Sequence, residues 1–313
     1  ISYVQNPIDQ SGSERTFSQD NKTHLVDSIE IDSLYNLGIV KANQNQINSV
    51  YVLDYQPFPV VKKIQLDTQK VSMTYGFGRG RGPGELINPT DFDITNNGNV
   101  WIADEPQSKI LIFDSSGDLS DEWVIEFTPY KLAGRENNMA IYGSFDPVVK
   151  FVDATQSVKW TSNYIVENPR KWASATTGFL LNDQNTIYKI SNYTGELVAF
   201  NGSGEVDYLR RVISFESNQD IFQPIKGLDF EAYGINRSNL KYAVADGFIS
   251  DEKIHLLIQI YGDDPHQVID VYATNTGEYL HSYRLEESVR SITSLENGTI
   301  VGIQPDRLLI WEQ

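Results

Sequence analysis

The chain has 313 residues, which is the length of one large domain or two ordinary ones. Its 42 Asp and Glu residues outnumber its 25 Lys and Arg residues, and the formal charge of −17 opposes binding to nucleic acid or to anionic lipid. The absence of cysteine excludes disulfides, thiolate nucleophiles and Cys-ligated zinc, and no apolar run reaches the roughly 18 residues of a membrane span.

The chain opens with a polar segment over 1–23 and begins with Ile rather than Met. We therefore expect a trimmed chain whose removed part carried an export signal or a lipid anchor. Residues 24–32, HLVDSIEID, follow as a strand-like run that has no partner in the next segment.

Short runs rich in Val, Ile, Phe and Trp then recur in groups of four, separated by Asn, Gly, Asp and Ser turns. The clearest group reads PTDFDI, VWIAD, KILIFD and LSDEWVIEF, over 88–127. Period-two alternation with such turns predicts an antiparallel four-stranded meander, which is one blade of a β-propeller. Weaker copies span about 37–76, 130–166, 172–215 and 240–285. Residues 216–239 break the repeat, and we expect a loop or short helix over one face there.

The last copy, from about 289 to the end, has only three strands. A propeller ring must close, because an open blade would expose an unpaired strand edge. We infer that 24–32 supplies the missing strand. The expected fold is thus all-β, a six-bladed β-propeller of four-stranded antiparallel blades whose last blade is closed by the N-terminal strand. A polar segment over 1–23 precedes a single propeller domain over 24–313, which we expect to be a monomer.

One blade also carries a family signature. It resembles the NHL-type repeat in its Gly-rich start, its Pro, and its two strands ending in Asp, at Gly84, Pro89, Gly98, Ala103, Asp104, Phe113, Asp114 and Gly117. The GRGPGE start together with the blade count is similar to a group of uncharacterised bacterial six-bladed propellers, many of them exported or lipid-anchored. The resemblance implies a periplasmic or cell-surface protein and the propeller fold. It implies no activity, because propellers host unrelated functions.

The segment 76–85, GFGRGRGPGE, holds five glycines and two arginines in an otherwise acidic chain. Arg79 and Arg81 could hold a carboxylate, sulfate or phosphate. In the alternative interpretation the glycines only allow positive φ between two strands, and the arginines pair with Glu85 or Asp91.

Loops on one face of a propeller surround the central channel, where ligands usually bind. Mixed charges with aromatic rings suit a sugar or a peptide. The candidate ligand-binding residues on this face are Tyr55, Arg79, Arg81, Glu85, Tyr130, Lys131, His266 and Arg307. Each of them can equally be an ordinary polar loop residue.

Three acidic residues, Asp54, Asp104 and Asp306, recur at comparable blade positions. Lactonase-type propellers place a divalent cation in the channel, and a hard cation would need several such oxygens from separate blades. An Asp that ends a strand and caps a turn explains the same recurrence. No cofactor is expected beyond this possible cation.

Catalytic signatures are missing from the sequence. There is no G-x-S-x-G motif, and the four histidines show no metal-ligand spacing. We therefore favour a non-catalytic protein that binds a small polar ligand or a partner protein through its loop face. The alternatives are a metal-dependent hydrolase or lyase that uses channel carboxylates, and an assembly scaffold.

Overall fold

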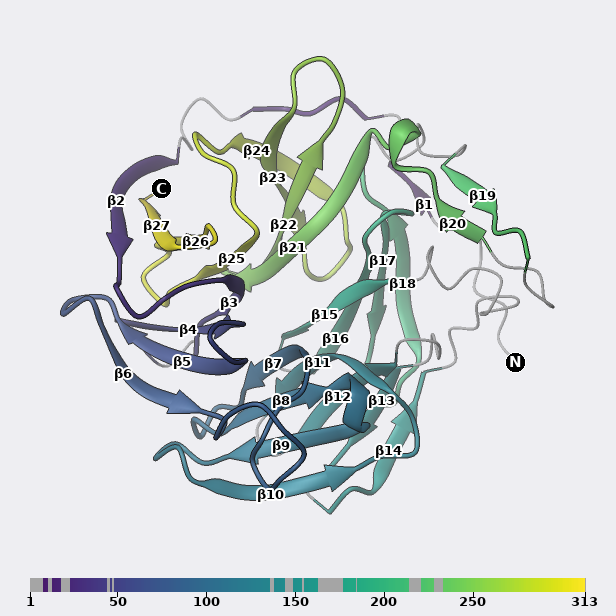
Figure 1. The fold of residues 1–313 in the computed structure, drawn as a ribbon. Helices are drawn as coiled ribbons and strands as arrows, with labels where there is room; N and C mark the ends of the chain where they lie inside the picture. Colours follow the sequence, from purple (N-terminus) through teal and green to yellow (C-terminus); the bar gives the residue numbers. More distant parts are fainter. Residues whose placement is uncertain are drawn as a thin grey trace.

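The computed structural model describes residues 8–10, 13–17, 23–43, 46, 48–135, 138–143, 149–153, 155–162, 177–183, 185–213, 221–227 and 233–312. Six four-stranded antiparallel sheets stand around a central axis as the blades of a propeller (Figure 1). The all-β, six-bladed architecture predicted from the sequence is confirmed. No helix of the described residues has the length and apolarity needed to cross a membrane.

The blades follow one another in chain order, and each runs from an inner strand at the axis to an outer strand at the rim. Blade 1 has β3 (Leu37–Lys41), β4 (Ser49–Asp54), β5 (Val60–Gln65) and β6 (Lys70–Tyr75). Blade 2 has β7 (Pro89–Ile94), β8 (Val100–Asp104), β9 (Lys109–Phe113) and β10 (Leu119–Val124), with a 3-10 turn, η1 (Glu105–Gln107), between β8 and β9. Blade 3 has β11 (Pro129–Arg135), β12 (Asn138–Gly143), β13 (Val149–Val152) and β14 (Val158–Thr161).

Blade 4 has β15 (Gly178–Asp183), β16 (Thr186–Ser191), β17 (Glu196–Phe200) and β18 (Val206–Arg211). Blade 5 has β21 (Tyr242–Ser250), β22 (Lys253–Ile260), β23 (His266–Ala273) and β24 (Tyr279–Arg284). Blade 6 has β25 (Ser291–Ser294), β26 (Ile300–Ile303) and β27 (Arg307–Glu312), with β2 (His24–Glu30) outside them.

The core lies between neighbouring blades, so the middle strands are covered on both faces. All six residues of β4 and all five of β8 are buried, which matches their nearly continuous apolar runs. Tyr51 and Leu53 of blade 1 pack with Phe92 and Ile102 of blade 2 in one such layer. The outer strand β6 instead alternates between exposed and partly buried residues, because one of its faces meets solvent.

The N-terminal strand closes the ring as predicted. β2 pairs antiparallel with β27, with Ile29 opposite Leu308 in the register. Ile29 is 1% exposed and packs against Leu34 and Leu37, whereas Val26 on the same strand is 50% exposed. One strand from the start of the chain thus completes the blade formed by its end.

The described part of the polar segment 1–23 does not stand apart from the propeller. β1 (Ile8–Asp9) adds a fifth, parallel strand beside β18 of blade 4, and Phe17 forms a parallel bridge to Ser282 of blade 5. The described N-terminal residues therefore follow the outer rim over blades 4 and 5 before β2 joins blade 6 (Figure 1).

The insertion expected over 216–239 is described in part. A two-stranded sheet pairs β19 (Phe222–Pro224) with β20 (Tyr233–Ile235), and a 3-10 turn, η3 (Arg237–Asn239), follows it. Residues 216–220 and 228–232 of this insertion lie outside the described part.

Candidate functional site

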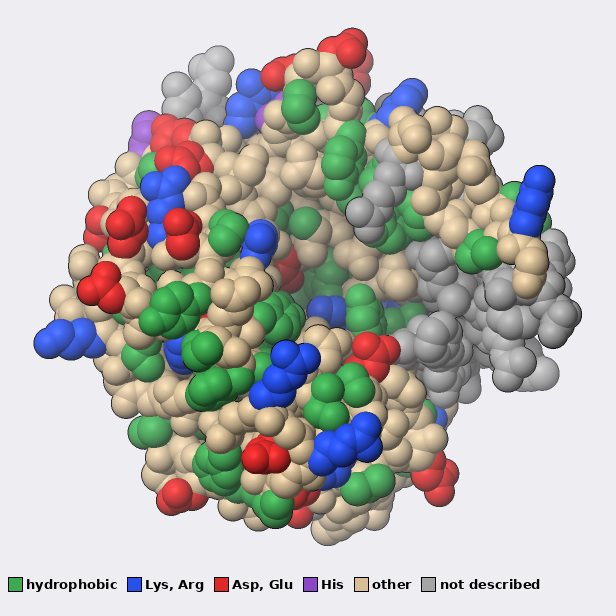
Figure 2. Space-filling view, in the orientation of Figure 1, with side chains coloured by type: hydrophobic (Ala, Val, Ile, Leu, Met, Phe, Trp, Pro, Cys, Tyr) green, Lys and Arg blue, Asp and Glu red, His purple; other side chains and the backbone are tan. Residues whose placement is uncertain are grey.

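A channel of about 640 Å³ runs along the axis of the ring. The inner strands of all six blades line it, namely β3, β7, β11, β15, β21 and β25. Figure 2 shows the hollow at the centre of the ring, with basic and acidic side chains inside it. The channel is therefore a polar cavity bordered by every blade.

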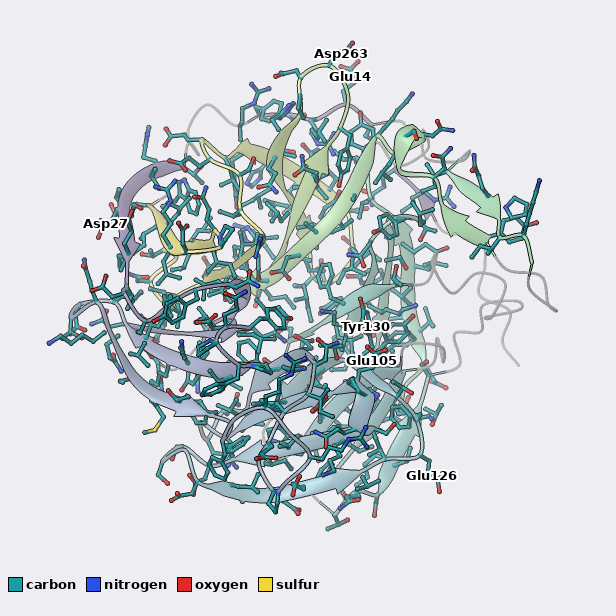
Figure 3. The ribbon with its side chains drawn as sticks, viewed as in Figure 1. Glu14, Asp27, Glu105, Glu126, Tyr130 and Asp263 are labelled. Atoms are coloured by element: carbon teal, nitrogen blue, oxygen red, sulfur yellow. The ribbon has the colours of Figure 1, made fainter. Side chains whose placement is uncertain are left out.

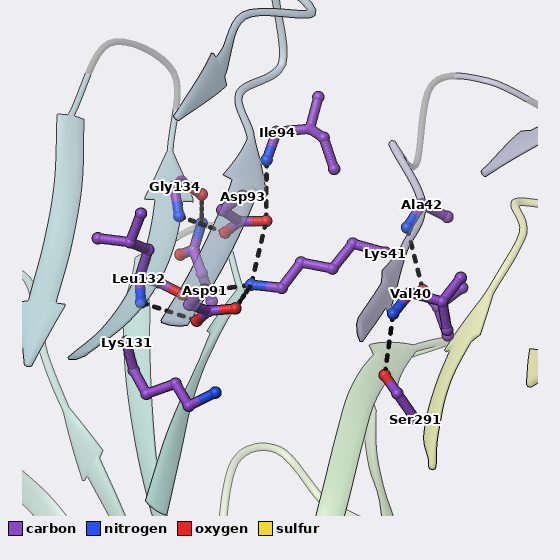
Figure 4. Close-up of polar contacts among 12 residues, drawn as sticks. Val40, Lys41, Ala42, Asp91, Asp93, Ile94, Lys131, Leu132, Gly134 and Ser291 are labelled. Carbon is purple, nitrogen blue, oxygen red and sulfur yellow. Dashed lines mark hydrogen bonds and ion pairs between the residues drawn. The ribbon is translucent and has the colours of Figure 1, made fainter. Parts of the chain in front are cut away.

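A lysine and two aspartates form the most concentrated charge cluster in the channel wall (Figure 4). Lys41 Nζ on β3 lies 3.4 Å from Asp91 Oδ1 and 3.7 Å from Asp93 Oδ1, both on β7. Burial alone would lower the pKa of Lys41, but the attraction of the two carboxylates reverses this and raises it. Burial raises the pKa of Asp93, against the opposing attraction of Lys41.

The same carboxylates also hold the next blade in place. Asp91 accepts a hydrogen bond from the Leu132 N–H at 2.9 Å, and Asp93 accepts one from the Gly134 N–H at 2.5 Å. Both N–H groups belong to β11, whose inner edge has no neighbouring strand. Asp91 and Asp93 reach the same edge because they occupy alternate positions of one strand. Side chains of blade 2 thus satisfy the open backbone of blade 3.

This arrangement recurs across the junctions on either side of blade 6. Asp246 of β21 accepts hydrogen bonds from the Ser291 hydroxyl and from the Ile292 N–H, the latter at 3.0 Å. Ser291 Oγ in turn accepts from the Val40 N–H of blade 1 at 3.0 Å. Burial raises the pKa of Asp246, whereas the hydrogen bond from Ser291 lowers it. Some of the polar side chains that line the channel therefore serve to join neighbouring blades.

Two further cations stand where chain segments enter the inner strands. Lys131 Nζ donates to the Thr90 carbonyl at 3.3 Å and lies 5.3 Å from the centre of the Tyr130 ring. Arg290 donates to the Asn36 amide oxygen and the Leu37 carbonyl, each at 2.9 Å. Tyr130, Lys131 and Arg290 all line the channel. Their hydrogen bonds go to neutral oxygens, and the Lys131 ammonium in addition attracts the Asp246 carboxylate. Both cations line the channel, where an anionic or hydroxylated ligand can contact them.

Asn182 of β15 is a third kind of channel group. Its Nδ2 donates to the Gly134 carbonyl at 2.6 Å, and its buried Oδ1 has no hydrogen-bond partner in the described part of the chain. A buried acceptor of this kind is satisfied in folded proteins by a donor from water or from a ligand.

Of the ligand-binding residues predicted from the sequence, Tyr130 and Lys131 line the channel. Tyr130 lies near the mouth, whereas Asp263, in the loop before His266, lies at the outer rim (Figure 3). His266 Nδ1 contacts the Asp264 carbonyl at 2.7 Å, and Arg307 forms an ion pair with Glu287 at 2.9 Å. The structure thus spreads the predicted set over the loop face and does not bring it into one site.

The remaining predicted residues lie outside the channel lining. Tyr55 packs its ring against Gly38, and burial raises its pKa to about 12. Glu85 accepts a hydrogen bond from the Gly82 N–H at 2.7 Å, and so stabilises its own glycine-rich turn. Arg79 and Arg81 are both exposed.

Two of the predicted metal ligands also act within loops. Asp54 is buried, accepts hydrogen bonds from the Tyr35 and Asn36 N–H groups, and forms an ion pair with Lys62 at 2.7 Å. Asp104 is equally buried and accepts from the Ile87 and Asn88 N–H groups.

The contacts of Asp54 and Asp104 agree with the turn-capping interpretation of the recurring aspartates. The third predicted metal ligand, Asp306, is exposed. Within the described ranges no three acidic or histidine side chains converge as metal ligands. A cation at Asp54, Asp104 and Asp306 stays a prediction.

Sequence reasoning did not place Lys41, Asp91, Asp93 or Asp246 in the channel, and named Asp91 only as a possible partner of the two loop arginines. A signal for them was present, because charged residues stood inside runs that were themselves predicted as the first strand of a blade, as in PTDFDI. First strands border the axis of a propeller, so charge within them indicates a polar channel.

Comparison with known proteins agrees with the fold. The model of the family DUF5128, described as a 6-bladed beta-propeller, matches residues 77–231. A "Putative exported protein" from Bacteroides fragilis superposes with a TM-score of 0.63 at 12% identity, over 97% of this chain and 98% of that one. The family match does not single out the NHL-type repeat.

Two further propellers are similar. The WD40 repeats of RRP9 give a TM-score of 0.58 at 10% identity, over 93% of this chain and 99% of that one. The Cps50 (Swd1) β-propeller domain of Myceliophteria thermophila gives 0.54 at 13% identity, over 93% and 99%. At such identities the likeness shows the fold alone. No curated protein sequence is significantly similar to the chain.

Proposed function

We propose that the protein binds a small polar molecule, a sugar or a short peptide, in its central channel. The observation that carries the proposal is the cavity itself. Its volume of about 640 Å³ falls within the range of about 300 to 1,000 Å³ that is typical of small-molecule sites. All six inner strands border it, so the site is formed by the closed ring and needs no separate domain.

The lining offers a matched set of donors and acceptors for such a ligand. Lys131 and Arg290 supply positive charge and N–H donors, and Asn182 Oδ1 supplies a buried acceptor. The ring of Tyr130 adds an apolar face against which a sugar ring or a peptide side chain can pack.

Binding, and not catalysis, is the proposed role. The channel carboxylates Asp91, Asp93 and Asp246 already accept hydrogen bonds from backbone amides of neighbouring blades. These bonds, together with the ion pairs of Asp91 and Asp93 to Lys41, fix the orientation of the carboxylates in the channel wall. Their arrangement suits a fixed wall better than groups that exchange protons with a substrate.

Ala245 provides a test that fills the channel without removing any polar contact. It lies at a bulge of β21 between Val244 and Asp246, lines the channel, and is exposed. In Ala245→Trp we expect a bulky ring in the cavity and binding at least about tenfold weaker, by isothermal titration with a panel of monosaccharides, disaccharides and dipeptides.

The matched control is Val124→Trp, which places the same ring on the outer strand β10 at a residue that is 70% exposed. It should bind as tightly as the unchanged protein. A panel in which no compound binds, or a ligand that binds Ala245→Trp with full affinity, would contradict the proposal.

A further inference from the structure

An arginine from the N-terminal segment is buried in the outer rim of blade 5. The Arg15 guanidinium donates from Nε to Asp270 Oδ1 at 3.0 Å and from Nη2 to Asp270 Oδ2 at 2.9 Å. The Arg15 side chain is only 9% exposed, and Asp270 on β23 is fully buried. The Tyr242 ring lies 5.3 Å from the guanidinium carbon. The pairing is bidentate, which lysine cannot reproduce.

Blade 5 itself organises the carboxylate that receives this arginine. Ser282 donates its hydroxyl to Asp270 Oδ1 at 2.6 Å, and the Tyr279 hydroxyl lies 2.8 Å from Ser282 Oγ. Burial raises the pKa of Asp270, and the attraction of Arg15 opposes this shift. A buried carboxylate held in this way is costly without a cation beside it.

The residues around Arg15 form hydrogen bonds with blade 5 as an added strand would. The Ser282 N–H donates to the Thr16 carbonyl at 3.0 Å, and the Thr16 N–H donates to the Tyr279 hydroxyl at 2.9 Å. The side chain of Gln10 both donates to the Gly277 carbonyl and accepts from the Tyr279 N–H, each at 2.8 Å. One of these bonds joins backbone to backbone, and the other three join a side chain to a backbone group. Together with the anchoring arginine they resemble the contacts of a peptide bound along a sheet edge.

Apart from Arg15, the segment buries little. Ser13, Glu14 and Thr16 are exposed, Phe17 is 45% exposed, and Glu14 lies at the rim of the molecule (Figure 3). Among the described contacts, residues 13–17 are therefore held mainly by Arg15 and a few backbone hydrogen bonds, so these five residues can leave blade 5 without opening the core.

We propose that a groove on blade 5, formed by Ser282 and Tyr279 of the edge strand β24 together with Asp270 of β23 and Tyr242 of β21, recognises an extended peptide that carries an arginine. The chain's own residues 13–17 occupy the groove in cis. An arginine-bearing segment of another protein takes their place when they leave. The groove lies on the rim, so it can be occupied independently of a ligand in the central channel.

The full-length variant Arg15→Ala opens the groove, and a labelled peptide of residues 8–17, IDQSGSERTF, is the probe. By fluorescence anisotropy we expect this peptide to bind Arg15→Ala at least tenfold more tightly than a peptide with Ala at the arginine position. A peptide with Lys there should also bind more weakly. The unchanged protein, whose groove is filled, should bind the arginine peptide at least tenfold more weakly than Arg15→Ala does.

Two further variants keep the test decisive. Adding Asp270→Asn to Arg15→Ala should remove the preference for arginine over alanine. Arg15→Gln removes the ion pair but keeps a long polar side chain, and so should admit the peptide even where Arg15→Ala folds poorly. Equal binding of the arginine and alanine peptides by both opened proteins, or no binding of either, overturns the proposal.

Discussion

Lys41→Met should lower the free energy of unfolding at pH 7 by about 3 kcal/mol, since removing one partner of a buried ion pair leaves its charge uncompensated. Two carboxylates, Asp91 and Asp93, lose their cation at once. Both are needed to hold β11, so they cannot turn away from the channel wall without leaving the Leu132 and Gly134 amides unsatisfied.

The pH dependence of this loss has a defined sign. The pKa of Asp93 is already raised by burial, and loss of Lys41 raises it further. An acid whose folded pKa lies above its unfolded value destabilises the fold increasingly as pH rises through the folded pKa. The difference between Lys41→Met and the unchanged protein should therefore be small near pH 4 and full at pH 7, in urea unfolding followed by tryptophan fluorescence.

Replacing both aspartates by asparagine should restore the stability that Lys41→Met loses. In Lys41→Met with Asp91→Asn and Asp93→Asn, the amide oxygens can still accept the Leu132 and Gly134 N–H bonds, and neither of the two side chains paired with Lys41 carries a charge. Stability at pH 7 should return to within about 1 kcal/mol of the unchanged protein. A triple variant as unstable as Lys41→Met would show that the cluster does not act through charge.

Ile29→Ala should lower the free energy of unfolding by about 3 kcal/mol, as large-to-small changes in cores do. Ile29 is buried opposite Leu308 in the strand that closes the ring, so the loss weakens the junction between the two ends of the chain.

Val26→Ala is the control for Ile29→Ala in the same strand, because its exposed side chain packs little. It should change stability by no more than about 0.5 kcal/mol. Equal effects of the two substitutions on the urea midpoint would indicate that β2 does not close the ring through its buried face.

The closure by β2 could be predicted because it rests on local patterns. Period-two runs bounded by turn residues indicate the strands of a blade. A last blade with only three strands requires a fourth from elsewhere in the chain. The turn-capping role of Asp54 and Asp104 could also be predicted, because each is the last residue of the second strand of its blade. These features depend on a few neighbouring residues.

The channel cluster and the rim groove depend on contacts between distant residues. Lys41 and Asp91 are 50 positions apart, and Arg15 and Asp270 are 255 apart, so no spacing in the chain indicates either pair. The glycine-rich loop is unusual in composition, and its two arginines were therefore predicted to bind a ligand. Both are exposed and lie outside the channel lining. Local composition identified an unusual loop, whereas the ring geometry decides which side chains meet.

One measurement separates the channel from that loop as the binding site. A sugar or peptide that binds the unchanged protein is titrated into Ala245→Trp and into Arg79→Ala with Arg81→Ala. A channel site predicts binding at least about tenfold weaker in Ala245→Trp and unchanged binding in the double arginine variant. Full binding to Ala245→Trp with loss in the arginine variant would contradict the channel site and place the ligand on the glycine-rich loop.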